Sequence, residues 1–208
     1  ISKPRYTAFD VSHTPSWLNV RDDMVYSLEQ PYAPASEFVW PSPFVPWLRD
    51  LYDYALQSFT INRSIGEALV ELNQRIYQDF VYNAQATEIH TPLSEIFTQR
   101  AGVCQDFSHI MVGCLRAIGL PAQYVSGYLL TKPPEGQPKL RGADASHAWV
   151  SAYCPGAAGG WLELDPTNQA IADLGYVRLA YGRDFGDVSP LRGLIRGGGA
   201  HSLKIEVT

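Results

Sequence analysis

The chain has 208 residues, of which 46% are apolar and 12% aromatic, enough for one substantial hydrophobic core. Charged residues make up 18%, and 16 basic against 21 acidic side chains give a net charge of −5. This composition excludes an intrinsically disordered chain, which would be poor in aromatics and rich in charge. The acidic balance argues against nucleic-acid binding, which needs a basic face, and against attraction to anionic lipid.

The first forty residues are rich in proline and aromatics, show no helical periodicity and include short extended segments at 5–11 and 24–28. They predict an arm, or the remnant of an upstream β region, over residues 1–42, followed by one core domain over residues 43–208. No run of eighteen apolar residues is present, so no membrane-spanning segment is expected. No signal peptide is recognisable, which favours the cytoplasm, and a start at Ile1 rather than Met indicates missing upstream residues.

Four helices are predicted between residues 44 and 119 from apolar residues spaced three and four apart. The first covers 44–59, and the second begins at Ser64, with Glu67 as its capping-box partner. The third covers 92–100. The fourth has Cys104 at its N-terminus, carries an apolar stripe from 107 to 118 and ends at Gly119, just before a proline.

After this proline the pattern becomes that of strands, predicted at 123–131, 146–154, 160–167, 176–181 and 203–207. A Pro/Gly-rich stretch at 132–145 is interpreted as an exposed connection, with a gate over a site as the alternative. Because helices come first and strands follow with short connections, the sequence predicts an α+β fold. In it, N-terminal helices pack on a largely antiparallel β-sheet.

The three cysteines include no C-x-x-C pair, which argues against a disulfide scaffold and a cysteine-rich zinc site. Cys104 differs from the other two, because a helix N-terminus presents free N–H groups and a positive dipole end that stabilise a thiolate. Cys114 lies on the apolar stripe and Cys154 at a strand end, so both are expected to be packing residues. The odd count therefore predicts one reactive thiol.

A cysteine nucleophile needs a base, and the base needs an acceptor that orients it. His147 and Asp165 lie on two successive predicted strands. An antiparallel hairpin that pairs Trp149 with Glu163 would place them directly opposite each other, with Cβ atoms about 4.5–5.5 Å apart. A slip of one residue would separate them, so this register is an assumption. His109, by contrast, is expected to be a core histidine with a backbone partner.

Asp106, in the first turn of the cysteine-bearing helix, is explained by capping alone, because a carboxylate is favoured at the positive end of the helix dipole. A metal bound by Cys104, His147 and Asp165 is chemically allowed, but no short ligand spacing supports it. No phosphate loop, nucleotide fingerprint or EF-hand loop is present, so no metal and no organic cofactor are expected.

Four blocks follow one another in the second half of the chain: R-A-G-V-C-Q-D-F-S-H-I at 100–110, D-A-S-H-A-W-V at 144–150, W-L-E-L-D-P-T at 161–167 and G-R-D-F-G-D-V-S-P at 182–190. In this order they resemble bacterial transglutaminase-like proteins of the transglutaminase-like cysteine peptidase superfamily. The resemblance covers about residues 64–208 and implies a papain-like transglutaminase core. It places the nucleophile at Cys104, the histidine at His147 and the aspartate at Asp165, which the helix end and the hairpin also select.

The resemblance implies a cysteine-dependent acyl-transfer enzyme acting on a peptide or protein amide. The Cys104 thiolate would attack the carbonyl, His147 would protonate the leaving amine, and Asp165 would hold the imidazole. We expect water to resolve the acyl-thioester, as in a peptidase or amidase, because transamidation needs a site that excludes water. A protein-glutamine transamidase is the alternative within the class. A non-catalytic binding module with a papain-like groove is the alternative of another class, and the intact triad argues against it.

The backbone N–H of Cys104 is expected to stabilise the oxyanion. Gln99, Tyr82 and Trp149 are weaker candidates for a second donor or a substrate contact. A solvated glutamine and packed aromatic rings are the simpler interpretations of these three. The acidic and basic residues of the closing block are expected to form a charged turn that fixes the strand beside the site.

Overall fold

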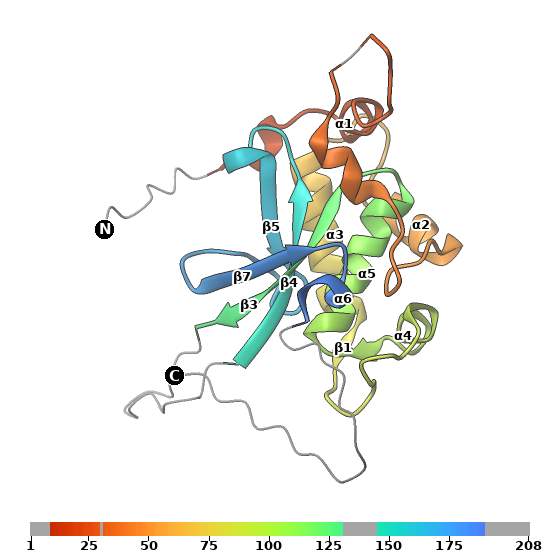
Figure 1. Cartoon of the computed structure of the whole chain (residues 1–208), viewed down its shortest axis with the longest axis vertical. Coiled ribbons are helices and arrows are strands. Elements are labelled where there is room, and N and C mark those ends of the chain that lie inside the picture. The colour runs from red at the N-terminus through yellow and green to blue at the C-terminus, as the bar shows by residue number, and fades with distance from the viewer. Residues whose placement is uncertain (1–8, 30, 131–144, 190–208) are drawn as a thin grey trace, which may run out of the picture.

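The computed structural model describes residues 9–29, 31–130 and 145–189 (Figure 1). The strand predicted at 203–207 lies outside these residues, as does the connection predicted at 132–145 apart from Ala145, which begins a strand. The helices lie on one side of the molecule and a β-sheet on the other (Figure 1). The α+β prediction is therefore confirmed.

The four predicted helices are present, as α2 (Arg49–Leu56), α3 (Ile65–Asp79), α4 (Leu93–Gln99) and α5 (Cys104–Ala117). Helix α2 begins later than predicted, since Leu48 is extended, and the prolines at 41, 43 and 46 disfavour helical geometry in the residue that precedes each of them. Ser64 precedes α3, and its hydroxyl donates a 2.5 Å hydrogen bond to the Glu67 carboxylate. Helix α5 stops where Gly119 takes a φ of +83°, in the left-handed region.

The first forty residues differ from the prediction, because they contain short helices. These are the 3-10 helix η1 (Val11–His13), helix α1 (Trp17–Asp22) and the 3-10 helix η2 (Pro34–Val39). Trp17 and Val20 of α1 are buried in the main core, where the indole packs edge-on against Phe59. The segment predicted to be extended at 24–28 forms turns instead. The domain boundary between residues 42 and 43 stays a prediction.

The sheet is antiparallel and has the strand order β6-β5-β4-β3-β7. Its strands are β3 (Ala122–Leu129), β4 (Ala145–Tyr153), β5 (Trp161–Asp165), β6 (Ala170–Ile171) and β7 (Tyr176–Gly182). The 3-10 helix η3 (Ala158–Gly160) connects β4 to β5, and helix α6 (Phe185–Val188) follows β7. A separate parallel pair, β1 (Val81–Tyr82) with β2 (Ala101–Gly102), lies beside the start of α5.

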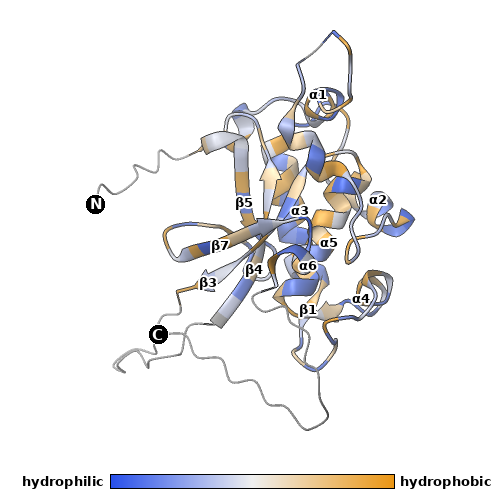
Figure 2. Ribbon diagram, in the orientation of Figure 1, coloured by the Kyte–Doolittle hydropathy of each residue, from blue (hydrophilic) through white to orange (hydrophobic). Residues whose placement is uncertain are grey.

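Helix α5 is the centre of the fold, since it packs against α2 and against strands β3 and β4. Every residue from Asp106 to Arg116 is buried. Figure 2 shows apolar residues on α2, α3 and α5. Gly113 permits the close approach of α2, because a Cβ there would lie 2.6 Å from Leu51 Cδ1. The core therefore holds α5 and its first residue in a fixed position against the sheet.

Candidate active site

Cys104 is the first residue of α5 and is half-buried against Tyr124, Ala148 and Val188. The start of the helix is fixed by Asp106, whose carboxylate accepts hydrogen bonds from Val103 N (2.8 Å) and Thr87 Oγ1 (2.6 Å). Burial raises the pKa of Asp106, and these two hydrogen bonds act against it. The capping role predicted for Asp106 is therefore confirmed.

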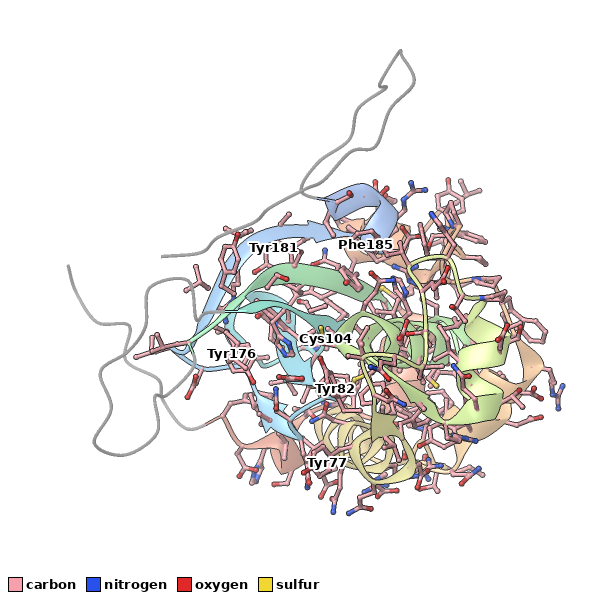
Figure 3. All side chains as sticks on the ribbon, turned by 90° about the horizontal axis from the view of Figure 1, so that it is seen from below. Tyr77, Tyr82, Cys104, Tyr176, Tyr181 and Phe185 are labelled. Atoms are coloured by element: carbon pink, nitrogen blue, oxygen red, sulfur yellow. The ribbon has the colours of Figure 1, made fainter. Side chains whose placement is uncertain are left out.

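The segment leading into Cys104 is held by strand β1. Val81 N donates to Arg100 O and Asn83 N donates to Gly102 O, both at 2.8 Å. Gly102 has no room for a side chain, because a Cβ there would lie 2.9 Å from the Cβ of Asp106. The pairing of Tyr82 with Gly102 brings this exposed tyrosine two residues from the cysteine. Figure 3 labels Cys104 together with Tyr82 and Tyr176.

The structure brings His147 and Asp165 together, but in a different register from the predicted one. Glu163 is paired with Ser151 rather than with Trp149, a shift of two residues. A shift of two keeps each side chain on its face, so the histidine and the aspartate still share one face and become diagonal neighbours. His147 Nε2 lies 2.7 Å from Asp165 Oδ2.

Asp165 is fully buried and surrounded by hydrogen-bond donors. Its Oδ1 accepts from the backbone N–H groups of Thr167 (2.9 Å) and Asn168 (3.3 Å). Its Oδ2 accepts from Asn168 Nδ2 (2.7 Å) and Tyr176 Oη (2.8 Å) as well as facing His147. Burial acts to raise the pKa of Asp165, but the bond and charge of His147 and the other side-chain donors lower it below its usual value. The carboxylate is therefore held in its charged form.

His147 links this carboxylate to the thiol. Burial acts to lower the pKa of His147, but hydrogen bonds to Asp165 and Cys104, and the negative charge at both, raise it to about 9. Because Asp165 occupies Nε2, Nδ1 is the ring nitrogen left for the Cys104 sulfur. A protonated imidazole beside a thiol favours the thiolate, so the three side chains can generate a sulfur nucleophile.

The structure separates the three weaker candidates for an oxyanion or substrate contact. Gln99 is exposed on α4, and its amide donates to Ala101 O at 3.2 Å. Trp149 is completely buried and donates its N–H to Glu163 Oε2 at 2.7 Å, so it has no donor to offer an oxyanion. Its selection as an oxyanion or substrate contact is corrected on that ground. Tyr82 is exposed next to the nucleophile segment.

The other cysteines and His109 are packing residues, as predicted. Burial raises the pKa of Cys114 above its usual range and that of Cys154 to about 12. His109 is 2% exposed and accepts a hydrogen bond from the backbone N–H of Phe185 at 3.1 Å. Burial lowers the pKa of His109 to about 4, so the ring is neutral.

The closing block forms the predicted charged turn. Arg183 pairs with Asp187 at 2.8 Å, and the buried Asp184 accepts hydrogen bonds from Phe44 N (3.0 Å) and Gly186 N (2.8 Å). These contacts tie the end of β7 to the loop before α2. They therefore fix β7 beside the site.

Sequence reasoning missed three residues around the histidine–aspartate pair: Asn168, Tyr176 and, as an acceptor, Glu163. Asn168 follows Asp165 closely in a turn, a pattern that Asp and Asn side chains favour and that offered a local signal. Tyr176 comes from another strand, and no sequence spacing indicates its contact with Asp165.

Residues 9–29, 31–130 and 145–189 contain neither a candidate metal site nor a candidate membrane span. Within these ranges, no group of three or more His, Cys, Asp or Glu side chains is placed to hold a metal ion. None of the helices there combines the length and the apolar character needed to span a membrane.

The helix bearing a thiol and the antiparallel sheet bearing an imidazole–carboxylate pair define a papain-like transglutaminase core. The sequence profile described as Transglutaminase-like superfamily matches residues 54–166, and the chain belongs to this family.

The chain is also similar in sequence or structure to individual proteins. An uncharacterized protein of Mycobacterium tuberculosis is 48% identical over 145 residues, which are 69% of this chain and 46% of that protein. A protein-glutamine gamma-glutamyltransferase of Pseudomonas aeruginosa is 39% identical over 131 residues, 62% of this chain and 19% of that protein. The crystal structure of a proposed cysteine protease from Cytophaga hutchinsonii aligns with a TM-score of 0.64 at 24% identity, covering 85% of this chain and 55% of that one. This last likeness shows the fold alone. The chain spans about half the length of the mycobacterial relative, 46% of it.

Proposed function

We propose that the protein is a cysteine-dependent acyl-transfer enzyme that works through an acyl-thioester on Cys104, and that it is a peptidase or amidase. The observation that carries the proposal is the His147–Asp165 pair, 2.7 Å apart, beside Cys104 at the start of α5, where the thiol also raises the pKa of His147. Nucleophile, base and orienting acceptor thus stand in the order that thiol catalysis requires. Membership of a family with cysteine chemistry supports the same reading.

The mechanism begins with the Cys104 thiolate attacking the carbonyl carbon of an amide. As the tetrahedral intermediate collapses, the C–N bond breaks and imidazolium His147 gives its Nδ1 proton to the leaving nitrogen. Water then attacks the thioester, His147 takes one proton from it, the acid leaves and the thiolate–imidazolium pair is restored. Asp165 remains charged throughout and fixes the imidazole through Nε2.

The oxyanion of the tetrahedral intermediate needs donors near the sulfur. The N–H of Cys104 belongs to the first turn of α5, where amide groups have no acceptor within the helix. Tyr82, which is exposed beside Gly102, is the side chain we propose as the second donor. Gln99 is less suitable, because its amide is engaged by Ala101 O.

Transamidation is the second candidate. The Pseudomonas aeruginosa relative, named as a protein-glutamine gamma-glutamyltransferase, favours it, because 131 residues of the two chains align at 39% identity. In that reaction an amine replaces water in the second half of the mechanism. A non-catalytic binding module is the third candidate, and the raised pKa of His147 beside a thiol argues against it, since binding alone requires no such pairing.

A screen of peptide and acyl-donor substrates, run with and without an amine acceptor, tests the proposal against a Cys104→Ala control. We expect products without the amine in the wild type and none in the variant. Products that appear only with the amine would replace hydrolysis by transamidation. If Cys104 reacts with iodoacetamide no faster than Cys114, and His147→Ala leaves that rate unchanged, the binding module becomes the better reading.

A further inference from the structure

A second carboxylate on β5 forms a network of its own, two residues before Asp165. Glu163 accepts hydrogen bonds from Trp149 Nε1 (2.7 Å), from Arg178 Nε (2.6 and 2.8 Å to its two oxygens) and from Tyr181 Oη (3.1 Å). The residues come from β4, β5 and β7, so the network joins strands on both sides of the histidine-bearing strand. Figure 3 labels Tyr181.

The network reaches the catalytic histidine of the proposed mechanism through one indole ring. Trp149 lies two residues after His147 on the same face of β4, and the two rings are close to parallel, 23° apart with centroids separated by 6.1 Å. The same indole packs edge-on against Tyr176, which donates to Asp165. Gly127 of β3 pairs with His147 of β4. Its lack of a side chain leaves space for the Trp149 indole, because a Cβ at Gly127 would lie 2.6 Å from that ring.

Glu163 accepts the hydrogen bond of the Trp149 indole N–H, which has no access to water. Trp149 is completely buried, so loss of this acceptor would leave its N–H unsatisfied and favour a different ring position. Arg178 neutralises the carboxylate at 2.6 Å, so that Glu163 adds little negative charge beside the imidazolium. The geometry therefore suits an orienting role better than an electrostatic one.

We propose that Glu163 is a positioning residue that acts through Trp149 to fix the ring plane of His147, while Asp165 fixes its position through Nε2. The inference rests on the proposed function, because it gives a second support to the same imidazole. Among the described residues, the titratable groups that act on that imidazole are Cys104 of α5 and Asp165 of β5, and the Tyr176 ring of β7 packs against it. Glu163 and Arg178 lie beyond the indole.

The test is the rate at which iodoacetamide alkylates Cys104, followed by mass spectrometry from about pH 5 to pH 10. Trp149→Phe keeps a ring and removes the N–H, whereas Glu163→Ala removes the acceptor. We expect each to slow alkylation at pH 7 about tenfold, as small misplacements of reacting groups do. We also expect the apparent pKa of His147 in this pH profile to fall from about 9 toward its ordinary value of 6.5.

Two further variants separate positioning from folding. Glu163→Gln keeps an oxygen that can accept from the indole, so it should retain more of the rate than Glu163→Ala. Glu71→Ala, which breaks the ion pair between Glu71 of α3 and Arg63, is the matched control and should leave the profile unchanged. The double variant of Trp149→Phe and Glu163→Ala should be no slower than its slower parent, because the two residues act in series.

The outcomes distinguish the inference from the proposed function. A His147-dependent rate that Trp149→Phe and Glu163→Ala leave unchanged overturns the inference alone, even if both variants melt earlier. Losses that multiply in the double variant also overturn it, because they mean independent action. A wild-type rate that His147→Ala leaves unchanged overturns the proposed function and the inference together.

Discussion

Replacing Asp165 with asparagine exchanges one carboxylate oxygen for an NH2 group at almost constant size. In the wild type, Oδ1 accepts from two backbone amides, and Oδ2 faces His147, Asn168 and Tyr176. Either orientation of the amide turns its NH2 group toward existing donors. The variant therefore loses the charge and leaves an NH2 group facing donors, either at His147 or at the two backbone amides, in a site where water cannot replace the lost acceptor.

The magnitude follows from the pKa of His147. Raising this pKa from 6.5 to about 9 stabilises the imidazolium by about 3 kcal/mol, at about 1.4 kcal/mol for each pH unit. Asp165 supplies the larger hydrogen-bond contribution and Cys104 the smaller. We expect the pKa of His147 in Asp165→Asn to fall to its ordinary value or below, because burial then acts with little opposition. If this whole amount, about 3 kcal/mol, is lost from the thiolate–imidazolium pair, the rate of thiol reaction at neutral pH falls by at most roughly a hundredfold.

The assay is alkylation of Cys104 across pH, combined with urea unfolding of both proteins. Because the folded pKa of His147 lies above its unfolded value, its contribution to stability is complete below about pH 6.5 and is lost as the pH rises through about 9. Asp165, whose folded pKa is lowered, contributes above its unfolded value near 4. The stability advantage of the wild type should thus be greatest between about pH 4 and 6.5. An alkylation rate at neutral pH within about twofold of the wild type, with an apparent His147 pKa still near 9, would refute the reasoning.

Three further predictions follow from the neighbourhood of α5. His109→Gln removes a group whose pKa in the folded protein, about 4, lies below its usual value of 6.5. As the pH falls from 6.5 to 4, the wild type should therefore lose about 3 kcal/mol of unfolding free energy in urea titrations, and the variant should not. Gly102→Ala crowds Asp106 and should lower stability by about 1–3 kcal/mol and slow Cys104 alkylation, so an unchanged melting temperature would contradict the packing argument. Cys114 and Cys154 are buried with raised pKa values and should resist iodoacetamide until urea unfolds the chain, which peptide mapping of the labelled protein can check.

Local signals were sufficient to place the nucleophile segment. The period of apolar residues, the left-handed Gly119 and the following proline define α5, and the carboxylate of Asp106 fixes its start. These features lie within a few residues of the element that they define. The first forty residues lacked such signals, because α1 has six residues, and its stability comes from Trp17 packing on Phe59 rather than from periodicity.

Alternation predicted the face of each side chain on β4 and β5, but not the strand register. The register depends on the connection between the strands, in which Cys154 N bonds to Gly160 O at 2.8 Å and Gly160 N to Ala157 O at 2.9 Å. Gly156, Gly159 and Gly160 adopt positive φ angles of 100°, 68° and 80° there. This compact loop begins directly after Tyr153, which pairs with Trp161, whereas the predicted register paired Ser151 with Trp161. Sequence alternation contains no information about that difference.

The observed register explains why the imidazole can serve two partners at once. In a pair of antiparallel strands, two residues that are diagonal neighbours are about 7–8 Å apart, whereas the Cβ atoms of directly opposed residues are about 4.5–5.5 Å apart. Across the longer gap the far nitrogen of His147, Nε2, meets Asp165, and Nδ1 remains for the sulfur of Cys104. The same diagonal joins Trp149 to Glu163 through the indole N–H, which also lies far from its backbone. One register therefore aligns both ring donors of β4 with both carboxylates of β5, and a one-residue slip would break the two contacts together.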